Sequence, residues 1–177
     1  SPQIACTNRI EESSYKELRE TGQKVITALG LTNCATHMEW FFGPKGLKVS
    51  EIGARPAGER IWDMHVAGNE FDLYRDWALA VMHGRVEGKP TRKYAVGSVQ
   101  IRPERDGRYR GHDGVESALR AIGDGMVECE LPAPGTTTQP LEKGWHVNTW
   151  FRVRRENYDE LRALLDLIAK TVRPRVG

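Results

Sequence analysis

The sequence of 177 residues lacks a long apolar run, a strong charge of one sign and any paired cysteine spacing. No stretch approaches the roughly 20 apolar residues of a membrane helix, and residues 1–9 contain no signal-peptide hydrophobic region. The formal net charge is only +2, and we interpret the basic clusters at 89–110 and 152–155 as solvated faces of strands. A nucleic-acid surface is usually more one-sided. We therefore expect a cytoplasmic protein with no nucleic-acid or membrane partner.

The three cysteines are Cys6, Cys34 and Cys129, an odd number without paired spacing. This excludes a disulfide framework and a cysteine-rich zinc site. Cys34 lies in an apolar strand pattern, so we expect it to be a small core residue. Nothing in the sequence marks any of the three as a nucleophile.

Helical and strand patterns interleave along the whole chain, which predicts an α/β (α+β) fold. The stretch 55–68 is expected to be irregular, because Pro56 and Gly58 interrupt it. The last helix has one apolar face, which we expect to pack on the sheet that contains 94–101 and 145–153. The expected helices are 11–29, 70–82, 115–122 and 157–172, and the expected strands are 34–42, 47–55, 94–101, 126–131 and 145–153.

The character of the chain changes after Gly88, Lys89 and Pro90. We therefore expect one domain at 1–90 and a smaller mixed α/β unit at 91–177. No internal repeat and no low-complexity segment is present.

The turn at 43–46 decides which side chains of the expected hairpin meet. Proline suits the second position of a type I turn, and glycine suits the left-handed position after it. Pro44 and Gly46 therefore predict a three-residue loop with Gly43 opposite Leu47. The facing pairs are then Glu39 with Glu51, His37 with Gly53, and Phe41 with Val49.

Two facing carboxylates, Glu39 and Glu51, should repel each other and weaken the hairpin. They are a solvated pair, two residues that a slipped register separates, or the two sides of a divalent-cation site. Carboxylate oxygens are ligands that Mg²⁺ prefers, usually together with substrate phosphates. Arg55 falls on the same face because side chains alternate along a strand.

The runs from His37 to Phe42 and from Glu51 to Gly58 resemble the ATP-grasp pattern. In that family an acidic residue ends one strand, and a Glu-x-Asn-x-Arg stretch follows about a dozen residues later. The segments 28–31 and 68–73 fit the same frame. The resemblance covers 10–85 well and implies the carboxy-terminal lobe of the fold. The remainder resembles, more loosely, the lid of biotin-carboxylase-like and amino-acid-ligase members.

The resemblance implies part of an ATP-dependent carboxylate–amine ligase, or a ligase of a related nucleophile, that acts through an acyl phosphate. Its cofactors would be ATP and Mg²⁺. By position, Glu39 and Glu51 would be the Mg²⁺ ligands that hold the ATP phosphates. Arg55 would contact the nucleotide, the acyl phosphate or the substrate carboxylate. The sequence departs from the family at Gly53, where asparagine often supplies a third ligand; this implies either a subfamily with a small residue there or weaker metal binding.

The family also implies partners for this chain. Its lysine-bearing strand, glycine-rich flap and hinge lie before the position of Ser1, so we expect the missing amino-terminal half to be a partner and the chain to be inactive alone. A small carboxylate substrate and a second copy in a homodimer are further candidate partners. His37 is expected to pack beside the site or support a ligand. The alternative is a non-catalytic interaction module that retains the scaffold.

Overall fold

The computed structural model describes residues 1–139 and 149–177 and divides the chain into two compact units. Unit 1 comprises Ser1–Asn8 and Lys93–Gly177, and unit 2 comprises Arg9–Arg92. The mixed α/β fold class is confirmed. The division into domains at residue 90 stays a prediction. None of the described helices is long and apolar enough to cross a membrane.

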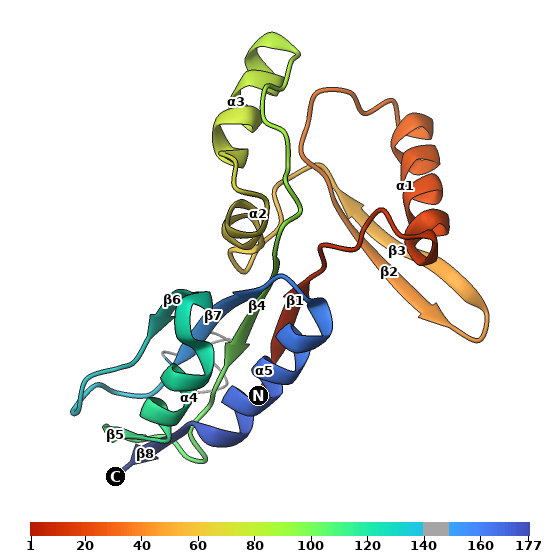
Figure 1. Cartoon of the computed structure of the whole chain (residues 1–177). Coiled ribbons are helices and arrows are strands. Elements are labelled where there is room, and N and C mark those ends of the chain that lie inside the picture. Colours follow the sequence, from red (N-terminus) through yellow and green to blue (C-terminus); the bar gives the residue numbers. More distant parts are fainter. Residues whose placement is uncertain (140–148) are drawn as a thin grey trace. The chain divides into compact units, whose positions relative to one another are not determined.

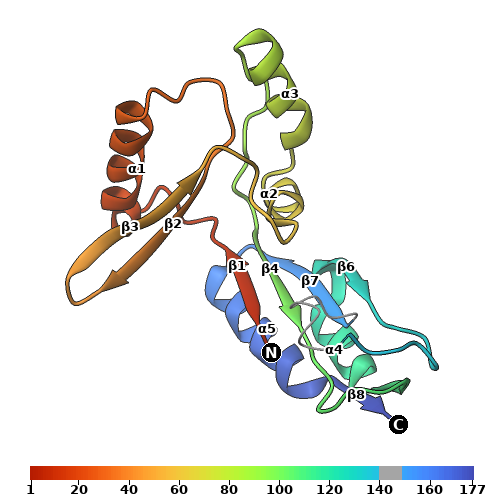
Figure 2. The same ribbon diagram turned by 180° about the vertical axis from the view of Figure 1, so that it is seen from behind.

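Unit 1 contains a four-stranded antiparallel sheet in the order β1-β4-β7-β6 (Figure 1). Its elements β4, α4, β6, β7 and α5 follow a β-α-β-β-α order, and β1 occupies the edge beside β4 (Figure 2). A short second sheet pairs β5 with β8. The bounds are β1 Gln3–Cys6, β4 Ala95–Gln100, β5 Tyr109–Asp113, α4 Val115–Ile122, η2 Gly123–Gly125, β6 Met126–Glu130, β7 Trp150–Arg155, α5 Tyr158–Thr171 and β8 Arg173–Val176.

The core of unit 1 lies between the helices and one face of this sheet. The expected packing of the last helix on the sheet is confirmed, and of the expected strand 145–153, positions 145–148 lie outside the described residues. A Cβ at Gly97 would stand 2.5 Å from Leu165 Cδ1, so the glycine permits the close approach of α5 to β4. The core residues from the strands are Ala95, Val99, Phe151 and Val153, and those from the helices include Ala118, Ile122, Leu161, Leu165 and Ile168.

Unit 2 consists of helices and one hairpin. Its elements are η1 Ser13–Tyr15, α1 Lys16–Ala28, β2 His37–Gly43, β3 Gly46–Gly53, α2 Ile61–Asn69 and α3 Leu73–His83. Helix α1 packs on the hairpin at Trp40, whose ring would lie 3.7 Å from a Cβ at Gly22. Within unit 2 the only large apolar side chain in the buried core is Met64. The exposed large apolar residues of unit 2 are Leu29, Phe41, Phe42, Val49, Tyr74, Trp77, Val81, Met82 and Val86.

Several expectations are corrected by the structure. The stretch 55–68 is not irregular throughout, because α2 begins at Ile61, and apolar residues surround this helix instead of forming one stripe. Strands β1, β5 and β8 have only four or five residues each and were not expected. Cys34 is exposed and is no core residue. Arg152, expected on a solvated strand face, is only 4% exposed.

A buried carboxylate fixes the segment that follows α3. Asp76 is 4% exposed, and its two carboxylate oxygens accept hydrogen bonds from the backbone N–H of Glu87 (3.3 Å) and of Gly88 (2.6 Å). A Cβ at Gly88 would collide with Asp76 Oδ2 and with Phe71 Cδ2. The absence of a side chain at Gly88 therefore permits this close approach.

We expect Gly88→Ala to lower the free energy of unfolding of the chain by about 1–3 kcal/mol, as overpacking usually does. The added methyl group must displace Asp76 or the ring of Phe71. The measurement is a urea-unfolding series with Gly43→Ala as the control, because a Cβ at Gly43 meets nothing within 4 Å. Equal stability of the two variants would contradict this account of Asp76.

A histidine and a buried tyrosine stack in unit 1. The rings of Tyr109 and His112 lie 5.4 Å apart at 23°, and His112 Nε2 lies 2.9 Å from Thr149 Oγ1. Burial lowers the pKa of His112, and the cation of Arg175 lowers it further, while Asp113 acts against them. Burial also lowers the pKa of His65 in unit 2. Folding therefore favours the neutral imidazole at both positions.

We expect the free energy of unfolding to fall as the pH drops through 6.5, the ordinary histidine pKa. Below this pH the unfolded chain takes up protons that the folded chain binds only at lower pH, so acid favours unfolding. In His112→Gln the fall should be shallower, because one of the contributing groups is gone. Urea unfolding at several pH values measures the slope, and His83→Gln, which changes an exposed histidine, is the control. An unchanged slope in His112→Gln would contradict the assignment.

Candidate functional site

The hairpin β2–β3 brings the two expected metal ligands together. Glu39 pairs directly with Glu51, and His37 pairs with Gly53 in the same antiparallel register. The geometric prediction that the two carboxylates face one another is therefore confirmed. The alternative of a slipped register that separates them is excluded.

The turn itself differs from the expectation. Gly43 pairs with Gly46 across a two-residue loop, so Phe41 faces Lys48, and the expected pairing of Phe41 with Val49 is wrong. A β-bulge between Glu39 and Trp40 on the pairing ladder then shifts the register by one residue. The extra residue stands in β3 instead of in the loop, and a bulge of this kind leaves one residue unpaired. The shorter loop and the bulge cancel, so the register at the carboxylates is the expected one.

The carboxylates lie on the face of the hairpin that α1 does not cover. Trp40, on the other face, packs against α1, and strand residues alternate between faces. The side chain of Glu39 is 52% exposed, and His37 Nε2 lies 4.0 Å from its Oε1. His37 therefore stands beside the carboxylate, at the limit of an ion pair when it is protonated.

Arg55 folds back over the same face, beside Gly53. A Cβ at Gly53 would lie 3.4 Å from Arg55 Cγ and 3.6 Å from its Nε. One nitrogen of the guanidinium donates to the carbonyl of Pro56 at 2.9 Å. Because Gly53 is two residues from Glu51, its missing side chain would point to the carboxylate side. Arg55 occupies the space beside Gly53, the position where the ATP-grasp pattern that the sequence resembles often has an asparagine.

The loop after Arg55 has an unusual backbone conformation that was not predicted from the sequence. Glu59 and Arg60 have φ angles of 52° and 55°, which are left-handed values for two consecutive residues that are not glycine. Arg60 also precedes α2 and its Nε donates to Asp63 Oδ2 at 2.8 Å. Such conformations gather at functional sites. No sequence signal could have found them, because neither position is a glycine or an asparagine.

The donor set on the hairpin fits a hard divalent cation held by two carboxylates. Among the residues that the structure describes, no group of three or more His, Cys, Asp or Glu side chains is arranged to hold a metal ion. Magnesium needs no such group, because it usually binds one or two carboxylates together with waters and phosphates. Glu39 and Glu51 would hold it, and the remaining ligands would come from outside the hairpin.

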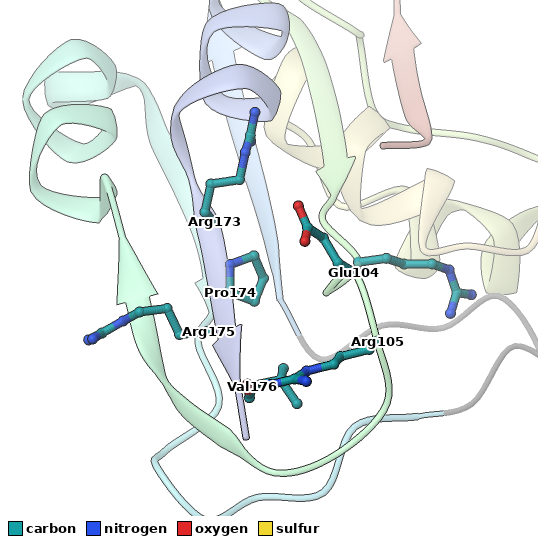
Figure 3. Close-up of a pocket in the computed structure, with 7 residues that line it drawn as sticks. Glu104, Arg105, Arg173, Pro174, Arg175 and Val176 are labelled. Carbon is teal, nitrogen blue, oxygen red and sulfur yellow. Dashed lines mark hydrogen bonds between the residues drawn. The ribbon is translucent and has the colours of Figure 1, made fainter.

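A cavity of about 570 Å³ lies in unit 1, and none of these residues lines it (Figure 3). Its arginines do not converge: Arg173 and Arg175 point apart, Arg173 donates to the carbonyls of Ala169 and Val172, and Arg105 donates to the carbonyl of Val176. We therefore assign no anion site to this cavity. Its lining residues are Arg102, Glu104, Arg105, Arg173, Pro174, Arg175 and Val176.

In the isolated chain we expect Glu51→Gln to stabilise the hairpin by roughly a few tenths of a kcal/mol at low salt, because it removes the repulsion from Glu39. Salt screens exposed charges, so the gain should vanish near 0.5 M salt. Urea unfolding at the two salt concentrations measures it. Lys48→Gln, a charge change on the same strand that leaves the carboxylate pair intact, is the control and should show no such gain. A loss of stability in Glu51→Gln at low salt would contradict the repulsion.

No protein-family model matches the sequence, and no curated protein matches it. Solved structures do match in fold. An L-amino acid ligase from Bacillus licheniformis matches at a TM-score of 0.76 and 14% identity over 99% of this chain and 44% of its own.

Two synthetases match over a similar span. N5-carboxyaminoimidazole ribonucleotide synthetase from Thermotoga maritima matches at a TM-score of 0.68 and 18% identity, over 99% of this chain and 46% of its own. Phosphoribosylglycinamide synthetase from Anaerococcus prevotii matches at a TM-score of 0.69 and 16% identity, over 99% of this chain and 45% of its own. The chain thus spans less than half the length of each protein. All three are ATP-grasp enzymes, and this chain has the fold of their carboxy-terminal part.

Proposed function

We propose that this chain is the carboxy-terminal part of a cytoplasmic ATP-dependent ligase that joins a carboxylate to an amine, or to a related nucleophile, through an acyl phosphate. The observation that carries the proposal is the direct pairing of Glu39 with Glu51, with Arg55 on the same face. A hairpin that places two carboxylates side by side is less stable than one that separates them. A cation between the carboxylates would offset this cost.

In this proposal the three side chains bind and orient charged groups and form no covalent bond. Glu39 and Glu51 hold Mg²⁺, which supplies positive charge at the ATP phosphates. Arg55 donates to the acyl phosphate or to the carboxylate of the substrate. Phosphoryl transfer depends mainly on such positioning and charge neutralisation. No serine or cysteine nucleophile is required.

The partner in this proposal is the amino-terminal half of an ATP-grasp enzyme. The chain spans 44–46% of the three neighbours, so more than half of each neighbour has no counterpart in it. Unit 2 buries little apolar surface of its own and exposes Phe41, Phe42 and Met82 by 69%, 80% and 72%. Exposed apolar surface of this kind is typical of an interaction site. We therefore expect the amino-terminal half to cover unit 2 and to supply most of the nucleotide contacts.

We expect the chain alone to bind Mg-ATP poorly, because two carboxylates provide only part of the octahedral shell of Mg²⁺. In the enzyme completed by an amino-terminal half, Glu39→Gln or Glu51→Gln should lower the rate on the order of a hundredfold or more. Calorimetric titration of the chain with Mg-ATP measures binding, and ADP release by the completed enzyme measures turnover. Glu20→Gln, on the exposed face of α1, is the matched charge control.

Micromolar binding of Mg-ATP by the isolated chain, or near-normal turnover in Glu51→Gln, would show that the site is wrongly assigned. The second candidate function is a non-catalytic interaction module that retains the ATP-grasp scaffold. The reading frame upstream of Ser1 distinguishes the two. A contiguous ATP-binding half there would favour the ligase, and its absence would favour the module.

A further inference from the structure

The hairpin offers a metal ion two carboxylates, and the next position on the same face of β3 is a glycine. Gly53 follows Glu51 by two residues and pairs with His37, so a side chain at position 53 would point to the carboxylate side. Magnesium demands a nearly octahedral shell of oxygen ligands, and two carboxylates fill only part of it. What stands beside Gly53 therefore decides whether the hairpin itself can supply a further ligand.

The side chain of Arg55 fills the place where a side chain at position 53 would begin. A Cβ at Gly53 would lie 3.4 Å from Arg55 Cγ, 3.6 Å from its Nε and 3.9 Å from its Cδ. The aliphatic stem of the arginine thus packs against the bare backbone of the glycine. An asparagine at this position would compete with that stem for the same space.

Arg55 occupies this place without using up the carboxylates. Its guanidinium donates to the carbonyl of Pro56 at 2.9 Å, and among the described residues no ion pair joins it to Glu39 or Glu51. Arg55 is exposed, and the side chain of Glu39 is 52% exposed. The oxygens of the pair are therefore open to an ion from solvent.

The charge of Arg55 acts in the same direction as its bulk. A guanidinium remains protonated throughout the pH range in which proteins are folded. Because Arg55 lies over Gly53, on the side of the carboxylates, its positive charge opposes the approach of free Mg²⁺. A phosphate that arrives with the metal changes this balance, since its oxygens complete the metal shell and also accept hydrogen bonds from a guanidinium.

We propose that Arg55 stands in the place of a third protein ligand and thereby makes firm binding of Mg²⁺ depend on a phosphate-bearing ligand. Glu39 and Glu51 alone hold the ion weakly, and phosphate oxygens supply the ligands that the hairpin lacks. The glycine at position 53 provides the space that Arg55 needs. This inference rests on the proposed role of the two carboxylates as metal ligands.

The test measures binding of Mg²⁺ alone to the full chain. The backbone amide resonances of Glu39 and Glu51 in ¹⁵N-labelled protein are followed by NMR while magnesium chloride is added at constant ionic strength. We expect a saturable shift with a half-saturation on the order of several millimolar, and loss of this shift in Glu51→Gln. In Arg55→Ala the half-saturation should fall about three- to tenfold, because a repelling charge is gone.

A second substitution separates the effect of space from that of charge. Gly53→Asn alone should change the Mg²⁺ affinity by less than about twofold, because the stem of Arg55 keeps the amide from the metal. Combined with Arg55→Ala, it should tighten binding by a further factor of about three or more, because the amide oxygen then becomes a ligand. Gly53 has no left-handed φ, so its backbone accepts an asparagine.

The control for a general effect of charge is Lys45→Gln. Lys45 is exposed in the turn of the hairpin, so its loss should change the Mg²⁺ affinity by less than about twofold at physiological salt. Arg55→Gln removes the charge and keeps part of the stem. It should also bind Mg²⁺ more tightly than the wild-type chain, and it tests the charge even when Arg55→Ala fails to fold.

Two results would overturn this inference and leave the metal site intact. One is equal Mg²⁺ affinity in the wild-type chain and in the Arg55 variants. The other is a gain from Gly53→Asn that is as large with Arg55 present as without it. The absence of a saturable shift in every chain, the Arg55 variants included, would instead contradict the proposed metal role of Glu39 and Glu51, and this inference with it.

Discussion

In the hairpin of unit 2 the negative charges of Glu39 and Glu51 face one another on neighbouring strands, and the backbone register of the hairpin holds them there. Its register is fixed by a two-residue loop and one bulge, and a shift by a single residue would move one carboxylate to the opposite face. The face that carries Glu39 and Glu51 is therefore set by backbone pairing, while the packing of Trp40 on α1 fixes the other face. Electrostatic repulsion between the carboxylates is the cost of this register. Arg55, folded over Gly53, places a cation on this face.

The two units reach stability in different ways. Unit 1 closes a core between its sheet and two helices, with side chains such as Phe151 and Leu165 fully buried. Unit 2 has a two-stranded hairpin, and an isolated hairpin of two strands is only marginally stable in water. It relies instead on local polar contacts, such as the carboxylate of Asp76 that accepts from two backbone N–H groups. A unit built in this way has its apolar surface available for a partner.

The sequence predicted most of the elements whose periodicity is regular. The apolar stripe of the last helix and its packing on the sheet were predictable, because a helix of 3.6 residues per turn must cover such a stripe. Helix α2 was not predictable in this way, because apolar residues surround it and because Pro56 and Gly58 precede it. The facing carboxylates were predicted through a loop that was one residue too long, and only the bulge restored the pairing. A bulge has no clear sequence signal, and neither do the left-handed conformations of Glu59 and Arg60. The burial of Arg152 could not be predicted either, because alternation along β7 specifies the face of a side chain but not what covers that face.

The pairing of β1 with β4 makes unit 2 an insertion within unit 1. The edge strand of the sheet is made before the whole of unit 2, and its neighbour β4 only after it. Bringing the two together closes a loop that contains all of unit 2, and the entropy of closing such a loop grows only slowly with its length. If unit 2 is already folded, its ends at Arg9 and Arg92 are held together by the ion pair between Glu11 and Arg92, so much of this closure has been achieved in advance. The order of folding can therefore run against the order of synthesis, with β1, which is made before unit 2, among the last strands to join this sheet.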